Sequence, residues 1–209
     1  MEDVLELYAE PYDPARPVVC FDEASKELRG QVAEPVPAEP GRTAKEDYEY
    51  TREGTANVFI AVEPLAGRRE VAVTERRTAA DFADQMRRMC DEWYPEGAVI
   101  RVVLDNLNTH SPASLFGTFP PEEAWRLLRR LEFHYTPKHA SWLNMAEMEL
   151  SVLARQCLDR RIASREELAR EIAHWQSERN RHRVAIEWCF RVADARRKLA
   201  HLYPQKPLR

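Results

Sequence analysis

Two short apolar runs, each closed by an aspartate, constrain the fold of this chain more than any other feature. Val18–Phe21 is followed by Asp22, and a run over 99–104, interrupted by one arginine, is followed by Asp105. Short runs of this kind are typical of strands inside a sheet that is covered on both faces. A helix predicted over 79–94 would form part of a right-handed crossover between them. As parallel neighbours, the two strands would bring both aspartates to one rim of the sheet, about 4.8 Å apart.

Carboxylates this close repel each other unless a proton or a cation lies between them. A hard divalent cation such as Mg²⁺ takes oxygen ligands and removes the repulsion. A helix that begins at Trp142 offers a third carboxylate, because Glu147 lies at the margin of its apolar stripe, where burial is costly without a partner. Glu149 is about 200° further round that helix and is expected to point away. Taken singly, a turn cap, a polar strand exit and a surface residue explain these acidic residues. Their combination predicts a site for two-metal phosphoryl transfer formed by Asp22, Asp105 and Glu147.

The remaining pattern predicts an α/β domain. Further strands are expected over 56–63, 69–75 and 131–135. Helices are expected over 2–9, 121–130, 142–158, 164–181 and 191–202. Strands joined by a hairpin come first and strands joined by helices follow, which predicts a mixed five-stranded sheet flanked by helices, with a C-terminal helical extension. The proline-rich residues 24–47 are expected to form an extended, mobile insertion.

Composition excludes several classes of protein. The 209 residues are 44% hydrophobic and 32% charged, which suits a folded domain. Apolar runs are only a few residues long, against the roughly 20 that a membrane-spanning helix needs. The N-terminus lacks the cationic start and apolar stretch of a signal peptide. Four widely spaced cysteines without a Cys-x-x-Cys argue against a structural zinc site.

Charge is divided unevenly along the chain. Residues 1–154 hold 17 Lys and Arg against 28 Asp and Glu, whereas residues 155–209 hold 14 against 7. The acidic part would repel DNA unless bound cations neutralised some of its charge. The basic part could hold a polyanion. Solvated helix surfaces with interspersed charge would also produce both of these charge distributions.

Three blocks of sequence resemble the signature blocks of DDE superfamily endonucleases and, within these, the mariner-related transposases of bacterial insertion sequences. The blocks are VCFDE at 19–23, VLDNLNTH at 103–110 and YTPKHASWLNMAE at 135–147. The similarity runs from about residue 17 to 203. It implies a ribonuclease-H-like fold in which Asp22, Asp105 and Glu147 are catalytic and bind two Mg²⁺ ions, for which Mn²⁺ could substitute.

The resemblance also implies a reaction and its partners. Water would nick the transposon end at a phosphodiester, and the freed 3′-hydroxyl would then join to target DNA. The implied partners are double-stranded DNA, as transposon ends and target, and either a second copy of the chain in a homodimer or a separate DNA-binding subunit. Residues 24–47 would be a clamp loop that reaches the partner subunit. The implied location is the bacterial cytoplasm, associated with the nucleoid and not with a membrane.

The resemblance divides the chain into three parts. Residues 17–160 would be the catalytic domain, and 161–209 would be basic helices packed on it. Residues 1–16 would be a linker remnant, too short for the helix-turn-helix modules that precede such catalytic domains. The chain would then be part of a longer or frameshifted protein, a decayed copy, or a protein that acts with a DNA-binding subunit. A structure-specific nuclease of the same fold and a catalytically silent relic that pairs with full-length transposase remain alternatives.

Several other side chains are candidates for supporting roles. Glu23 alternates away from Asp22, so it is expected outside the ligand set, where it could hold a water molecule. His110 could contact the scissile phosphate or a metal-bound water, or make an ordinary loop hydrogen bond. Lys138 and His139 could hold a phosphate or simply lie in an exposed turn. The basic helices offer six candidate contacts to the DNA backbone: Arg179, Arg181, Arg183, Arg196, Arg197 and Lys198. A solvated helix surface explains these basic residues nearly as well.

Overall fold

A mixed five-stranded sheet forms the centre of the protein, as predicted. The computed structural model describes residues 1–33, 36–45 and 47–203. The strand order is β3-β2-β1-β4-β5. β1 pairs antiparallel with β2 and parallel with β4, and β5 continues parallel to β4. The strands are β1 (Val18–Gln31), β2 (Tyr50–Glu63), β3 (Arg68–Thr74), β4 (Ile100–Leu104) and β5 (Leu131–Tyr135).

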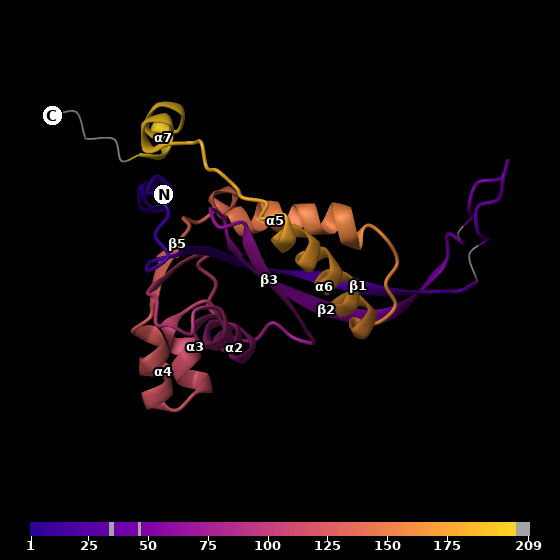
Figure 1. The fold of residues 1–209 in the computed structure, drawn as a ribbon, viewed down its shortest axis with the longest axis horizontal. Coiled ribbons are helices and arrows are strands. Elements are labelled where there is room, and N and C mark those ends of the chain that lie inside the picture. The colour runs from indigo at the N-terminus through magenta and orange to yellow at the C-terminus, as the bar shows by residue number, and fades with distance from the viewer. Residues whose placement is uncertain (34–35, 46, 204–209) are drawn as a thin grey trace.

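Helices cover both faces of this sheet (Figure 1). α5 (Met145–Leu153) and α6 (Arg165–Arg181) lie on one face, and α2 (Ala79–Arg88), α3 (Pro112–Thr118) and α4 (Pro121–Leu128) lie on the other. α2 and α5 each continue into a π-helical turn, over Met89–Trp93 and Ala154–Leu158. The chain ends in α7 (Val192–Lys198) and a short turn over Ala200–Leu202. No helix in the described ranges is both long enough and apolar enough to cross a membrane.

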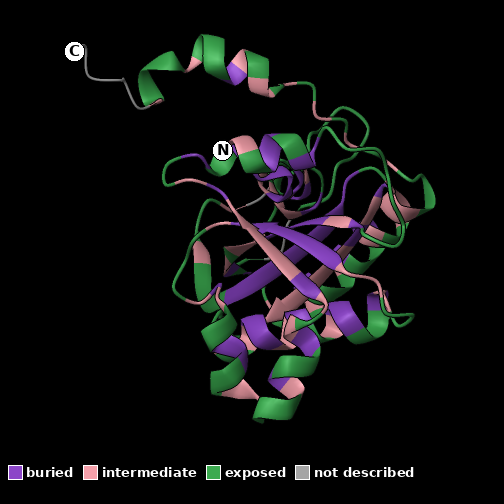
Figure 2. Cartoon of the chain, turned by 90° about the vertical axis from the view of Figure 1, so that its left-hand side faces the viewer, coloured by how far each residue is buried: buried purple, intermediate pink, exposed green. Residues whose placement is uncertain are grey.

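Alternation along β1 gives the molecule two cores. Cys20 packs with α5 and α6, whereas Val19 and Phe21 pack with α2, α3 and α4. All three residues are at most 1% exposed, and the buried strands between the two helical layers are visible in Figure 2. Because neighbouring residues of a strand point to opposite faces, Asp22 lies on the face of α5 and Glu23 on the face of α2.

The terminal elements pack together. α1 (Glu2–Leu7) lies in the segment expected to be a linker, yet its Val4 and Leu5 are fully buried in the core beneath α5. Arg196 of α7 forms an ion pair of 2.7 Å with Glu2 of α1.

α3 was not predicted, because it is a seven-residue helix of weak helix formers that is anchored by the buried Leu115.

The expected insertion over 24–47 is wrong in its extent. β1 runs to Gln31 and β2 begins at Tyr50, so the first eight of these residues belong to a long hairpin that projects from the sheet (Figure 1). Its outer part is polar and is held by cross-strand pairing, for example between Glu27 and Arg52 at 3.3 Å. An apolar run is what predicts a strand from sequence, and the outer part of the hairpin contains no such run. Beyond β1, bridges join Val36 to Lys45 and Glu39 to Arg42, and residues 34, 35 and 46 lie outside the described residues.

A buried ion-pair cluster joins α5 to β3 and α6. Glu149 is 1% exposed, and its Oε1 lies 3.0 Å from Nε of Arg69 and 2.5 Å from Nε of Arg179. The side chain of Asn180 accepts from the backbone N–H of Arg69 and donates to its carbonyl, so α6 covers the open edge of β3. Glu149 therefore points away from Glu147, as predicted, but into a packed interface. Its charge fixes α5 against the sheet.

Removing this charge tests the cluster. Glu149→Gln is expected to lower the free energy of unfolding by about 3–5 kcal/mol, because it leaves buried guanidinium groups without a counter-charge. Urea unfolding measures the change. Glu178→Gln, which breaks the exposed pair with Arg181, is the matched control and is expected to cost less than about 1 kcal/mol. Equal stabilities of the two variants would contradict this account of α5.

Candidate active site

The register of two parallel strands sets Asp22 beside Asp105. β1 and β4 pair with Val18 opposite Arg101 and Cys20 opposite Val103. Asp22 follows Cys20 by two residues within β1, and Asp105 comes directly after Leu104, the last residue of β4, so both lie just beyond the paired part of the two strands. Cys20 and Val103 both face the core beneath α5. By alternation, Asp22 projects from that same face, whereas Asp105 lies in the loop after β4.

Asn144 brings Glu147 to these aspartates. Its side-chain Oδ1 accepts from the backbone N–H of Ala146 at 3.1 Å, which caps the start of α5. Its Nδ2 donates to the carbonyl of Phe21 at 2.8 Å. Asn144 is 1% exposed, so both bonds are shielded from water. The first turn of α5, which contains Glu147, is thereby fixed beside the residue that precedes Asp22. Sequence analysis did not single out Asn144, although an asparagine three residues before a glutamate is a helix-start pattern.

The pKa of Asp22 responds to burial and to the charges around it. Burial raises the pKa of Asp22 from 3.8 to about 7; the N–H of Glu23 donates to its Oδ1 and opposes the rise, while the negative charges of Glu23, Asp105 and Glu147 add to it. Asp22 is thus the carboxylate on which both of the others act. Such mutual repulsion is the arrangement that a divalent cation relieves.

The donor set suits Mg²⁺, although it does not form a closed cage. Among the described residues, no three His, Cys, Asp or Glu side chains converge tightly enough to enclose a single ion. Mg²⁺ is usually held by only one or two carboxylates and completes its coordination with water and phosphate oxygens. Three hard oxygen donors fit that requirement, and burial together with the neighbouring carboxylates raises the pKa of Asp22.

His110 lies in the interior and not on the rim of the site. Its Nδ1 is 2.5 Å from Oδ1 of Asp105, and its Nε2 is 3.0 Å from Oε2 of Glu23. Burial alone would lower the pKa of His110, but hydrogen bonds to Asp105 and Glu23 outweigh it and raise the pKa to about 9. The protonated imidazole donates from Nδ1 to Asp105, and its Nε2 forms an ion pair with Glu23. Neither ring nitrogen is directed at a substrate.

Lys138 and His139 flank the site. A hollow of about 310 Å³ is lined by Asp105–Leu107 from one loop and by Thr136–His139 and Ser141 from the next. Lys138 and His139 are both exposed at this hollow. His139 has a φ of 64°. Residues other than glycine seldom adopt this backbone conformation, and it recurs in functional loops.

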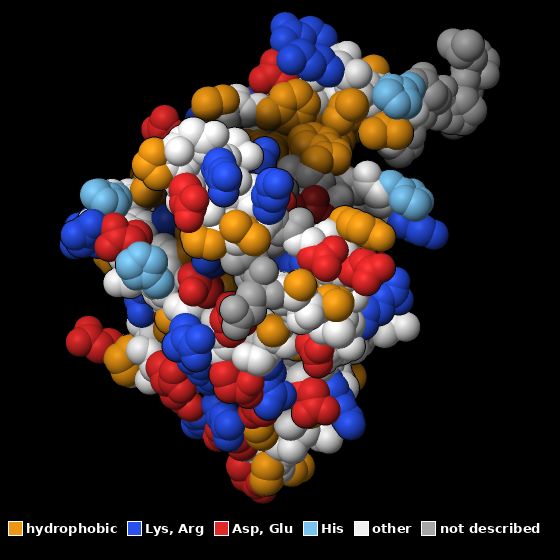
Figure 3. Space-filling model, turned by 90° about the vertical axis from the view of Figure 1, so that its right-hand side faces the viewer, with side chains coloured by type: hydrophobic (Ala, Val, Ile, Leu, Met, Phe, Trp, Pro, Cys, Tyr) orange, Lys and Arg blue, Asp and Glu red, His pale blue; other side chains and the backbone are white. Residues whose placement is uncertain are grey.

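The basic residues expected at the DNA backbone mostly contact other parts of the chain. Arg179, expected at the DNA backbone, has its Nε 2.5 Å from Oε1 of the buried Glu149 and neutralises that charge. At the surface, basic and acidic side chains are interspersed (Figure 3). The pairs are Arg181 with Glu178, Arg196 with Glu2 and Arg197 with Asp194, while Lys198 lies over the ring of Phe190. Arg183, with a φ of 44°, lines a separate hollow beside Gly67.

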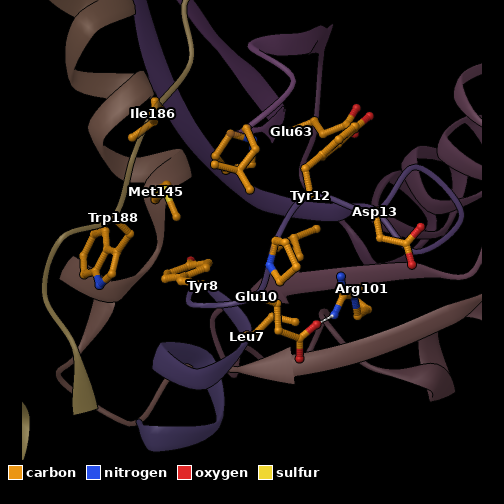
Figure 4. A pocket seen from close by; sticks show the side chains of 14 residues that line it. Leu7, Tyr8, Glu10, Tyr12, Asp13, Glu63, Arg101, Met145, Ile186 and Trp188 are labelled. Carbon is orange, nitrogen blue, oxygen red and sulfur yellow. Dashed lines mark hydrogen bonds and ion pairs between the residues drawn. The ribbon is translucent and has the colours of Figure 1, made fainter. Parts of the chain in front are cut away.

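A further pocket lies at the start of β1, around Val18 (Figure 4). Tyr8, Met145 and Trp188 form its apolar wall, and the ion pair between Arg101 and Glu10 lies at its edge. Tyr8 donates to the carbonyl of Leu143 at 2.8 Å, so this region holds the segment that leads into α5. Asp22, Asp105 and Glu147 are not among the residues that line it.

The strand order and the helices on both faces define a ribonuclease-H-like domain, with Asp22 within β1 and Asp105 directly after β4. Residues 17–169 match the family described as DDE superfamily endonuclease, and the chain belongs to that superfamily. No curated protein matches it in sequence.

Solved structures of Mos1 transposase share the fold. The Mos1 paired-end complex with the left transposon end is 15% identical, with a TM-score of 0.54, over 80% of this chain and 51% of that chain. The Mos1 strand transfer complex is 13% identical, with a TM-score of 0.55, over 80% and 50%. The Mos1 mariner paired-end complex with Mn is 16% identical, with a TM-score of 0.53, over 81% and 52%. The present chain spans about half the length of these proteins.

The pKa of Asp22 predicts how stability changes with pH in the absence of metal. Between pH values of about 4 and 7 the folded state binds a proton that the unfolded state has lost, so stability falls as the pH rises through this window. Asp22→Asn is therefore expected to be more stable than the wild type at about pH 8, and the difference is expected to disappear below about pH 4. Thermal unfolding in a chelator measures it.

Asp91→Asn is the matched control. Hydrogen bonds from Arg126 lower the pKa of Asp91, so this substitution is expected to act in the opposite direction and weakly, because the pair is near the surface. An Asp22→Asn variant no more stable than the wild type at about pH 8 would contradict the crowding of carboxylates at this site.

Proposed function

We propose that this chain is the catalytic domain of a mariner-related transposase that cuts DNA phosphodiesters and joins the freed 3′-ends, using Mg²⁺. Membership of the DDE endonuclease superfamily supports the reaction class. The likeness of the fold to Mos1 transposase supports the narrower assignment. The observation that supports the proposal is the parallel pairing of β1 with β4 up to Cys20 and Val103, two residues before Asp22 and Asp105, together with the bond from Asn144 at the start of α5 to Phe21.

Each carboxylate has a distinct part in this proposal. Asp22, Asp105 and Glu147 would together hold two divalent cations, and burial and the charges of the other two act on Asp22. When bound, such ions activate the attacking hydroxyl and stabilise the leaving oxygen. The protein supplies no covalent nucleophile, so its own residues act by holding ligands and DNA in place.

The DNA and its other partners follow from the same assignment. Lys138 and His139 would hold a phosphate next to Asp105, because they are exposed at the hollow that Asp105 lines. The substrate would be double-stranded DNA, both transposon ends and target. A homodimer, with the projecting β1–β2 hairpin reaching the partner subunit, or a separate DNA-binding subunit would provide the remaining contacts. The protein would act in the bacterial cytoplasm, on nucleoid DNA.

Plasmid nicking tests the catalytic assignment. Asp105→Asn is expected to reduce Mg²⁺-dependent nicking of supercoiled DNA by more than about 100-fold, because losing a direct ligand costs more than the roughly 10–100-fold for losing an outer partner. Chelation of Mg²⁺ is expected to stop nicking by the wild type. Asp91→Asn, at a surface pair, is expected to nick like the wild type. Undiminished nicking by Asp105→Asn would refute the site.

Joining of DNA ends separates a transposase from a simple nuclease of the same fold. A labelled oligonucleotide with a free 3′-hydroxyl is expected to become covalently attached to plasmid in the presence of the wild type. Nicking without joining would support a structure-specific nuclease. Absence of both, in a folded protein that binds Mg²⁺, would support a catalytically silent relic.

A further inference from the structure

β1 faces the active site with one residue and the opposite core with the next. Asp22 points toward α5, and Glu23 points toward α2, where its side chain is only 4% exposed. Burying a carboxylate in an apolar core is costly unless it has a partner. The partner of Glu23 at 3.0 Å is His110, whereas the nearest nitrogen of Arg77 is 3.9 Å away.

His110 is held rigidly between its two carboxylates. Its ring lies 4.9 Å from the ring of Phe82 and meets Phe21 edge-on at 5.8 Å. Its backbone N–H donates to Leu107 at 2.9 Å, and its carbonyl accepts from the hydroxyl of Tyr135 at 2.9 Å. The residue is 1% exposed. Rotation of the ring toward the DNA would require breaking its contacts with both carboxylates and both phenyl rings.

Asp105 depends on outside support more than Asp22 does. It follows the last residue of β4 and therefore lies on a loop, whereas Asp22 lies within β1. Within its own loop, Asp105 accepts from the N–H of Leu107 at 3.4 Å, which is long for a hydrogen bond. The 2.5 Å contact with Nδ1 of His110 is much shorter and engages the same oxygen, Oδ1.

We propose that Glu23 and His110 are positioning residues, which together hold Oδ1 of Asp105 so that its other oxygen faces the catalytic metal ion. β1 thus supplies one ligand directly through Asp22 and orients a second ligand from the opposite face of the sheet through Glu23. The inference rests on the proposed function, because it assigns the role of Asp105 as a ligand. Under this inference, His110 acts on the metal site through Asp105 and does not contact the DNA directly.

Mn²⁺ binding to the full chain, followed by electron paramagnetic resonance, tests this inference without DNA or turnover. His110→Ala is expected to weaken Mn²⁺ binding by about 10–100-fold, the usual effect of losing an outer partner of a ligand. His110→Asn is expected to restore most of the affinity, because its amide N–H can take the place of Nδ1. His110→Gln is expected to restore little, because its amide reaches the position of Nε2 and faces Glu23 instead.

Two control variants separate positioning from packing. Phe82→Leu disturbs the ring beside His110 and is expected to lower the melting temperature but leave Mn²⁺ affinity unchanged. His134 also lies between two carboxylates, at 2.9 Å from Asp3 and 3.6 Å from Glu132, but on the surface of β5. His134→Ala is therefore expected to bind Mn²⁺ like the wild type.

The outcomes for the inference and for the proposed function are distinct. A folded His110→Ala variant that binds Mn²⁺ like the wild type, or equal rescue by Asn and Gln, would overturn the positioning role while leaving the ligand set intact. Mn²⁺ affinity lost equally in Phe82→Leu would also overturn it, in favour of packing. Undiminished Mn²⁺ binding by Asp105→Asn would instead refute the proposed metal site itself.

Discussion

The parallel pairing of β1 with β4 is the constraint on which the rest of the structure depends. Its register brings Asp22 of β1 and Asp105, the residue after β4, toward the same edge of the sheet, where burial and neighbouring negative charge raise the pKa of Asp22 to about 7. This arrangement opposes folding in the absence of a cation, because like charges are brought together in a poorly solvated place. The two apolar cores on either side of the sheet, and the side chains that fix α5, offset that cost.

Much of the remaining architecture serves to hold α5 and the loop after β4. Asn144 fixes the first turn of α5 to β1, and Glu149 fixes its next turn to β3 and α6 through two arginines. His110 holds Asp105 from the other face of the sheet. These groups lie close to the proposed ligands in space, but their partners come from strands and helices distant in sequence. The carboxylates are therefore supported from both faces of the sheet.

The catalytic strands could be predicted from the sequence because a fully buried strand leaves an apolar run, and the aspartates that close the two runs stand out. The outer half of the β1–β2 hairpin could not, because its polar residues are stabilised by pairing with each other and not by burial. Periodicity showed that Glu149 points away from Glu147. It could not show that Arg69 and Arg179 would meet it there, since those residues come from β3 and α6.

The same limit applies to His110. Its spacing from Asp105 suggested a role near the site, but its contact with Glu23 depends on tertiary packing between β1 and the loop after β4. The roles of single basic residues were the least predictable, because an arginine on a helix can face DNA, solvent or a buried carboxylate with the same local sequence. Arg179 illustrates this, since its guanidinium pairs with Glu149.

A crystal structure of the protein soaked with Mn²⁺ tests the central claim most directly. Anomalous scattering would locate each ion without reference to activity. The account predicts two peaks about 3.5–4 Å apart, with Asp22 coordinating both, Asp105 one and Glu147 the other. Mn²⁺ bound elsewhere, with these three side chains left without a metal at saturating concentration, would contradict it.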